Sequence, residues 1–101
     1  RGALTDYDAA IAADATLAFV FNNRGVTRKT LGDLRGALAD YNEAIRLRPA
    51  FANAYFNRSA VYKALGKGAE AEADFVKSLT LRDAPAAQLE PPVEQVKADK
   101  P

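Results

Sequence analysis

The sequence predicts an all-α protein, built as an array of antiparallel helix pairs, and three observations support this fold class. The chain matches itself when it is shifted by 34 positions, and eight of the fourteen residues 1–14 are identical to their counterparts in 35–48. Within each unit, apolar residues recur at the spacing of an amphipathic helix. Gly32-Asp33 interrupts this pattern in the middle of one unit, and Leu31-Gly32 recurs one period later as Leu65-Gly66. A fixed period of this length is typical of a solenoid array.

Five helices with short connections are expected along the chain. The first carries Leu4, Tyr7, Ala10 and Ile11 on one face, and a turn at residues 14–16 follows it. The next four helices form two complete pairs, because the same pattern of small and bulky residues occurs twice. The five predicted helices cover residues 2–14, 17–30, 34–47, 51–64 and 68–81.

The residues between the helices fit these boundaries. Gly32 can adopt the left-handed conformation that ends a helix, and Asp33 can cap the helix that follows. Pro49 has no backbone N–H, and it pushes Arg48 out of helical geometry. Each helix pair buries its apolar stripe only against its neighbours, as expected for a repeat array.

These residues carry a resemblance to the tetratricopeptide repeat family, which covers residues 1 to about 83. The family pattern is an aromatic residue, a small residue, a turn Gly, an Ala, a second aromatic residue, an Ala and a Pro. The resemblance implies a right-handed superhelical array. The residues at these positions are Phe21, Gly25, Gly32, Ala37, Tyr41, Ala44 and Pro49, and the next repeat supplies Tyr55, Ser59, Gly66, Ala71, Phe75, Ser78 and Asp83.

Several positions depart from the family pattern. Gly36 lies inside a predicted helix, where Gly costs about 1 kcal/mol relative to Ala. Arg24, Arg28 and Arg58 stand where the family often has apolar residues. We expect the aliphatic stems of these arginines to pack while their guanidinium groups reach water.

The chain divides into four segments at this stage. Residues 1–16 are the second helix of a truncated repeat, residues 17–50 and 51–83 are complete repeats, and residues 84–101 are a tail that contains Pro. The tail is expected to be flexible, or to form a short capping helix over Pro92–Ala98. Because the chain starts at Arg1 and contains no Met, we expect a fragment of a longer protein with more repeats upstream.

The composition argues against several classes of function. The net charge of +1 does not favour a nucleic-acid or anionic membrane partner, and no apolar run reaches the length of a membrane span. Without His or Cys, the chain lacks the usual zinc ligands and the commonest general base. We therefore expect no enzyme activity, no metal and no cofactor. The absence of Cys leaves the compartment open, with the cytoplasm favoured.

The candidate site is the concave groove, which the first helix of each pair lines in arrays of this kind. The function predicted for this groove is to bind an extended peptide or a segment of a protein partner. Its predicted lining comes from residues 17–30 and 51–64 and comprises Phe19, Asn22, Asn23, Val26, Lys29, Asn53, Phe56, Asn57, Ala60 and Lys63.

Polar residues in this groove repeat with the period of the array. Asn23 and Asn57 are one full period apart, as are Lys29 and Lys63, so we expect each pair to stack in register. A side-chain amide can pair with a peptide backbone as donor and acceptor, and the lysines favour an acidic peptide. Asn57 also resembles the Asn of the clamp with which co-chaperone members of the family bind C-terminal carboxylates. Asn22 and Val26 do not match that clamp.

Two other readings remain open at this stage. The chain could be a self-association module, for example a homodimer, that uses the exposed face of residues 2–14 or the tail. The third interpretation is an enzyme, or an RNA-binding protein built from related helical repeats. Neither a catalytic constellation nor a basic groove supports it.

Overall fold

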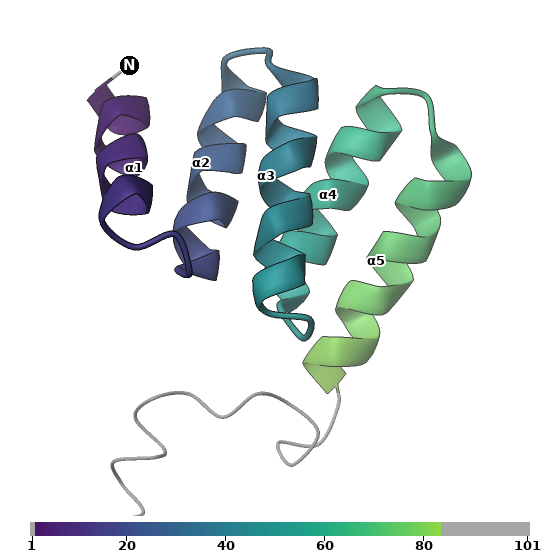
Figure 1. Cartoon of the computed structure of the whole chain (residues 1–101). Coiled ribbons are helices and arrows are strands. Elements are labelled where there is room, and N and C mark those ends of the chain that lie inside the picture. The colour runs from purple at the N-terminus through teal and green to yellow at the C-terminus, as the bar shows by residue number, and fades with distance from the viewer. Residues whose placement is uncertain (1, 84–101) are drawn as a thin grey trace, which may run out of the picture.

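The structure is a computed structural model that describes residues 2–83. The predicted tail, with the short helix considered over Pro92–Ala98, lies outside the described residues. The described part of the chain folds into five α-helices and contains no strand. The helices are α1 (Gly2–Ala13), α2 (Ala18–Thr30), α3 (Leu34–Leu47), α4 (Ala52–Ala64) and α5 (Gly68–Asp83) (Figure 1).

The predicted all-α array of antiparallel helix pairs is confirmed, and its boundaries differ from the prediction by only one or two residues. The helices α1, α2 and α4 are each shorter than predicted at one end. Helix α5 continues to Asp83 instead of ending at residue 81, because Pro85 is the first residue that cannot continue the helix. Helix α3 ends as expected, since Arg48 before Pro49 has an extended backbone with φ −144°.

The two turns within the helix pairs share one backbone geometry. Gly32 has φ 90° and Gly66 has φ 78°, which is the left-handed region that favours glycine. In the first turn the Asp33 N–H donates to the Arg28 carbonyl over 2.8 Å, and in the second the Lys67 N–H donates to the Tyr62 carbonyl over 2.8 Å. This is the Schellman pattern, which satisfies carbonyl groups at the end of a helix.

Asp33 caps α3, as the sequence predicts. Its carboxylate accepts the backbone N–H of Gly36 over 2.9 Å. The structure explains why a glycine stands at position 36, which the sequence does not reveal. A Cβ atom at this position would collide with the Asp33 carboxylate.

Replacing Gly66 with Ala is expected to lower the free energy of unfolding by about 1–2 kcal/mol, because an L-residue resists the left-handed conformation. Urea unfolding monitored by circular dichroism measures the loss. The matched control is Lys67→Ala. Lys67 is exposed in the same turn, and its backbone φ lies outside the left-handed region. Equal stabilities for the two variants would contradict the assigned turn geometry.

The core consists of two clusters that join consecutive helix pairs. In the first, Phe21, Ala44 and Ala54 are buried together, and Ile11 of α1 packs against them. In the second, Ala37, Tyr41 and Val61 are buried, with partly buried leucines packed around them (Leu34, Leu38 and Leu65). Because each cluster draws on both α3 and α4, the two repeats are fixed to one another by their cores.

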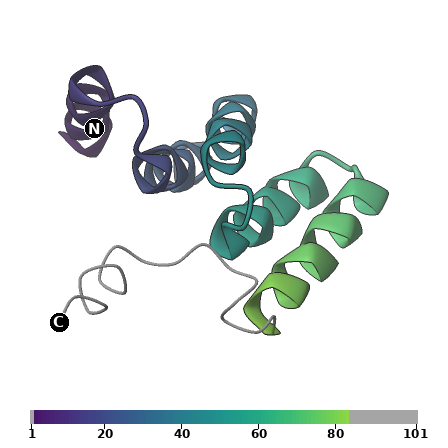
Figure 2. The ribbon, with the colours of Figure 1, turned by 60° about the horizontal axis from the view of Figure 1, so that its bottom comes forward.

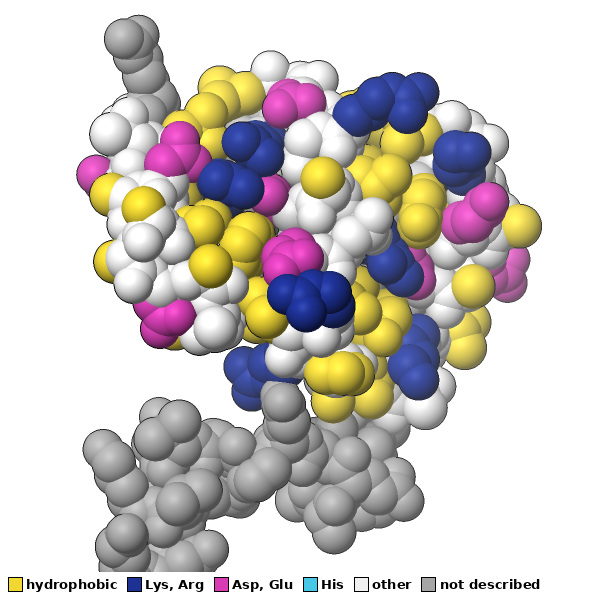
Figure 3. All heavy atoms as spheres, in the orientation of Figure 1, with side chains coloured by type: hydrophobic (Ala, Val, Ile, Leu, Met, Phe, Trp, Pro, Cys, Tyr) yellow, Lys and Arg dark blue, Asp and Glu magenta, His cyan; other side chains and the backbone are white. Residues whose placement is uncertain are grey.

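The helices follow a curve in which inner and outer positions alternate. Figure 2 shows α1, α3 and α5 on the outer side of this curve, with α2 and α4 on the inner side. Figure 3 shows Lys and Arg side chains interspersed with Asp and Glu on the face that it draws. The first helix of each complete pair therefore shares the inner side, which is the arrangement that the predicted groove requires.

Helix α1 is held less firmly than the helices that follow. None of its residues is fully buried, and Leu4, Tyr7, Ala10 and Ile11 are half-buried on the face that was predicted to pack. Self-association through its exposed face stays a prediction.

Candidate functional site

The helices α2 and α4 are joined directly by a hydrogen bond between two asparagine side chains. The Asn57 amide Nδ2 donates to Asn22 Oδ1 over 3.0 Å. Asn22 is only 7% exposed, so this bond satisfies an amide that lies beneath the surface. The surface formed by α2 and α4 on the inner side of the curve is called the α2–α4 face below.

The predicted groove residues differ in their accessibility on the α2–α4 face. Seven are exposed: Phe19, Asn23, Val26, Lys29, Asn53, Phe56 and Lys63. Asn57 and Ala60 are half-buried, whereas Asn22 is buried. Asn22 therefore supports Asn57 from below, and a role of these ten residues in contacting a peptide stays a prediction.

The asparagines do not pair along the repeat period. Asn23 is exposed, and Asn57 pairs with Asn22, which lies one position further away than a full period. The side chain of Asn53 is also engaged, because Arg82 Nη2 donates to its Oδ1 over 3.3 Å. The guanidinium group of Arg82 lies 5.4 Å from the centre of the Phe56 ring, so Arg82 contacts two residues of this face near the start of α4.

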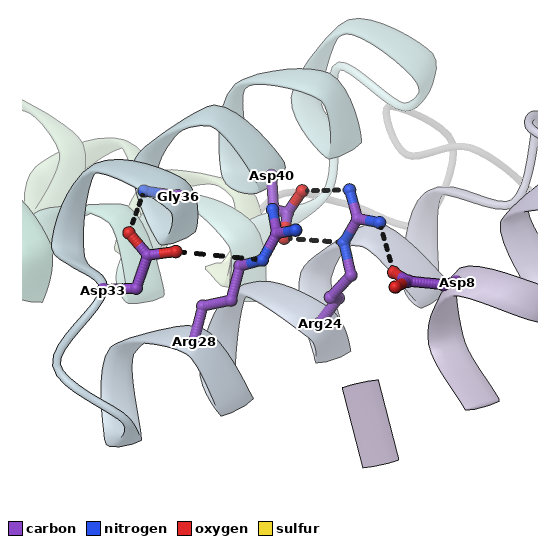
Figure 4. A network of polar contacts seen from close by, with 6 residues as sticks. All are labelled: Asp8, Arg24, Arg28, Asp33, Gly36 and Asp40. Carbon is purple, nitrogen blue, oxygen red and sulfur yellow. Dashed lines mark hydrogen bonds and ion pairs between the residues drawn. The ribbon is translucent and has the colours of Figure 1, made fainter. Parts of the chain in front are cut away.

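A network of arginines and aspartates lies behind the α2–α4 face (Figure 4). The Arg24 guanidinium donates to both carboxylate oxygens of Asp40, over 3.0 Å and 2.8 Å, and to Asp8 over 2.8 Å. Arg28 donates to Asp40 over 3.2 Å. The Asp40 side chain is only 3% exposed, so two guanidinium groups offset the cost of burying its charge. Arg24 thereby ties α2 to α3 in its own repeat and to α1 in the preceding one.

The same arrangement recurs one repeat later. Arg58 donates to the two Asp74 oxygens over 2.7 Å and 2.8 Å, and to Asn42 Oδ1 over 3.0 Å. Each of these residues stands one full period after its counterpart in the first network, so Arg24 and Arg58 connect the second helix of their own repeat with that of the preceding repeat. These two networks are called the arginine ladder below.

The expectation that the arginine heads reach water was wrong. The Arg24 and Arg58 side chains are 16% and 19% exposed, and their guanidinium groups are engaged by carboxylates. The hydrogen bonds that Arg24 and Arg58 donate to Asp40 and Asp74 raise the pKa values of the two guanidinium groups, although burial opposes the shift. The sequence held a signal for this pairing, because Arg24 and Asp40 both recur one period later, as Arg58 and Asp74.

Stability is expected to fall as the pH rises from about 10 to 12, because burial, together with the charge of Asp40, raises the pKa of Tyr41 to about 12. Tyr41 is 1% exposed and keeps its proton in the folded chain, whereas the unfolded chain releases it near pH 10. The contribution is complete below pH 10 and declines by about 1.4 kcal/mol per pH unit above it.

Urea unfolding at pH 9, 10 and 11 measures this dependence. Tyr41→Phe should remove most of the added slope, and Tyr55→Phe is the matched control for the loss of a phenol. An unchanged slope in Tyr41→Phe would contradict the assignment.

Within residues 2–83, no group of three or more His, Cys, Asp or Glu side chains could hold a metal ion. None of the helices in this range is long and apolar enough to cross a membrane. The exposed side chains of the α2–α4 face carry amide, ammonium and apolar groups.

Comparison with known proteins assigns the class of this fold. A family model described as a TPR repeat matches residues 28–66, and one described as a tetratricopeptide repeat matches residues 52–85. A search of curated protein sequences finds no match.

Solved structures of similar shape give the same answer. The second TPR of Spaghetti (RPAP3), bound to the HSP90 peptide SRMEEVD, is 31% identical with a TM-score of 0.75, covering 77% of this chain and 72% of that chain. The first TPR of Spaghetti (RPAP3), bound to the same peptide, is 28% identical with a TM-score of 0.77. The match covers 82% of this chain and 66% of that chain. The crystal structure of MamA, at 24% identity, matches in fold alone, with a TM-score of 0.74, covering 96% of this chain and 50% of that chain.

These matches define the protein as a helical-repeat solenoid. The chain belongs to the tetratricopeptide repeat family.

Proposed function

We propose that the chain is a non-catalytic interaction scaffold, which binds an extended segment of a protein partner across the α2–α4 face. The observation that carries this proposal is the exposure of three large apolar side chains on that face. Phe19 is 52% exposed, and Val26 and Phe56 are each 42% exposed. Apolar groups that are placed among polar ones in this way are typical of a binding surface.

The polar groups of the face suit an extended backbone with acidic side chains. The Asn23 amide is exposed and offers both a donor and an acceptor to a peptide group. Lys29 and Lys63 are exposed and add positive charge at the ends of α2 and α4. An extended acidic segment would find apolar contacts, backbone partners and charge complementarity on one surface.

The two similar Spaghetti (RPAP3) domains support a peptide partner, because both are bound to the HSP90 peptide SRMEEVD. This chain shares only Asn57 with the carboxylate clamp described above. Asn22 is buried and Val26 is apolar, so neither supplies a further polar contact to a terminal carboxylate. We therefore propose an internal acidic segment as the ligand, and we expect SRMEEVD to bind weakly.

The test selects ligands for the complete chain from a phage library of random twelve-residue peptides. Lys63→Glu is expected to weaken the selected peptides by about tenfold, which corresponds to about 1.4 kcal/mol of binding free energy. The matched control is Lys77→Glu, because Lys77 is also an exposed lysine but lies on α5, outside the α2–α4 face. Fluorescence polarisation measures the affinity of each protein for a labelled selected peptide. The same measurement with labelled SRMEEVD tests whether that peptide binds more weakly.

The two variants distinguish binding on the α2–α4 face from binding elsewhere on the chain. A loss of affinity in Lys63→Glu with no loss in Lys77→Glu supports the proposal. Equal affinities in all three proteins, or a loss confined to Lys77→Glu, would move the binding surface away from the α2–α4 face.

A further inference from the structure

A hollow of about 320 Å³ lies where the start of α4 meets the end of α5, at the lower edge of the array in Figure 1. Arg48 and Arg82 line it together with apolar groups that include Phe51 and Leu81. None of its lining residues within the described part of the chain is Asp or Glu. This hollow is called the two-arginine pocket below, and its uncompensated positive charge suits an anion.

Both guanidinium groups of the pocket are held over aromatic rings. The Cζ atom of Arg48 lies 5.2 Å from the centre of the Phe51 ring, and that of Arg82 lies 5.4 Å from the centre of the Phe56 ring. Arg82 also donates to Asn53 Oδ1 over 3.3 Å. A guanidinium group has five N–H donors along its edge, so a group whose face is held by a ring can still donate to a carboxylate.

The repeat register shows how this pocket differs from the same place one repeat earlier. Arg48 and Arg82 are one full period apart, and Asp14 stands one period before Arg48. The earlier repeat boundary therefore has one acidic and one basic residue at these two positions, whereas the later boundary has two basic residues. A carboxylate from outside the array would restore the missing negative charge.

The two-arginine pocket is continuous with the α2–α4 face. Asn53 belongs to both, and Arg82 contacts Phe56 of the face. Lys63 follows Asn53 by ten residues, which is about 15 Å along α4. An extended chain rises about 3.3 Å per residue and directs every second side chain to the same side, so residues i and i+4 span about 13 Å on one side. One extended segment can therefore reach both basic ends of α4.

We propose that the two-arginine pocket binds an acidic side chain of the partner segment, within a motif of two acidic residues four positions apart and an apolar residue midway. One carboxylate accepts charge-assisted hydrogen bonds from Arg48 and Arg82, and the other lies near Lys63. The apolar residue reaches Phe56, which stands between Asn53 and Lys63 on α4. This site rests on the function proposed above, because it assigns a second charged contact to the same segment.

Double-mutant cycles with the complete chain test this contact. The probe is the labelled peptide that was selected on the unchanged chain, together with versions in which one acidic residue at a time is replaced with Gln. The pocket variants are Arg48→Gln and Arg82→Gln. Arg35→Gln is the matched control for the loss of one positive charge, because Arg35 is exposed at the start of α3. Circular dichroism checks that each variant is folded, and fluorescence polarisation measures the affinities.

The selected peptides are expected to carry acidic residues at positions i and i+4. Arg82→Gln should weaken binding about tenfold, and Arg35→Gln less than about twofold. One particular Glu→Gln exchange in the peptide should cost about tenfold on the unchanged chain and less than about twofold on either pocket variant, because its carboxylate contacts both arginines. Unchanged affinity in Arg82→Gln, or a full cost of every exchange in both pocket variants, would overturn the assignment.

The variants also separate the pocket from the rest of the α2–α4 face. A loss of affinity in Lys63→Glu without a loss in Arg82→Gln would overturn the pocket and leave the proposed function standing. A loss in Arg82→Gln without a loss in Lys63→Glu would support the pocket and move the remaining contacts away from the α2–α4 face. A selection that yields no binding peptide would overturn both.

Discussion

Replacing Asp40 with Ala is expected to lower the free energy of unfolding by about 2–4 kcal/mol, because it leaves two partly buried guanidinium groups without their shared carboxylate. Arg24 would keep only Asp8, whose side chain is 59% exposed and provides a weaker partner. The effect should extend to α1, since Arg24 is also the link between α1 and α3. Urea unfolding at pH 7 measures the loss in stability.

The control for this variant is Glu43→Ala on the same helix. Glu43 pairs with Arg46 one turn away, and both side chains are at the surface, so the expected loss is less than about 0.5 kcal/mol. Similar losses for the two variants would mean that the arginine ladder contributes no more than a surface ion pair.

Replacing Gly25 with Ala is expected to destabilise the protein by about 1–2 kcal/mol, although Ala favours a helix over Gly by about 1 kcal/mol. A Cβ atom on Gly25 would lie 2.6 Å from Cε1 and 2.9 Å from Cδ1 of Tyr41. Tyr41 is fully buried between α2 and α4, so its ring has little room to move away. Either the helices separate or the ring leaves its preferred position.

The matched variant is Gly68→Ala, in which the new Cβ atom would have no neighbour within 4 Å. It should stabilise α5 by about 0.5–1 kcal/mol, so the two Gly→Ala changes have opposite signs. Thermal and urea unfolding of both variants provide the comparison. A stabilised Gly25→Ala would show that the contact between α2 and Tyr41 is looser than the structure indicates.

The sequence allowed the fold to be predicted closely because its determinants are local and repeat. Gly32 and Asp33 act within a single turn, and Pro49 acts on its own neighbour, so their roles follow from residue type alone. The small size of Gly25 is likewise explained by one aromatic ring in the paired helix. The fixed repeat period then places equivalent elements in equivalent positions.

The polar contacts between repeats were not predicted, because they depend on how neighbouring repeats are rotated. The bond between Asn57 and Asn22 joins residues one position out of the repeat register, so the period alone pointed to Asn23 instead. The role of Arg24 required knowing that Asp8 and Asp40 lie on either side of it. The repeat period identifies equivalent positions, but it does not show which side chains meet across a boundary.

Binding of a partner segment on the α2–α4 face is tested most directly by nuclear magnetic resonance of the ¹⁵N-labelled chain with a selected peptide. On titration, the largest shifts are expected at Asn23, Val26 and Lys29 of α2 and at Asn57 and Lys63 of α4. Shifts confined to α1, or to the outer surfaces of α3 and α5, would contradict binding on this face.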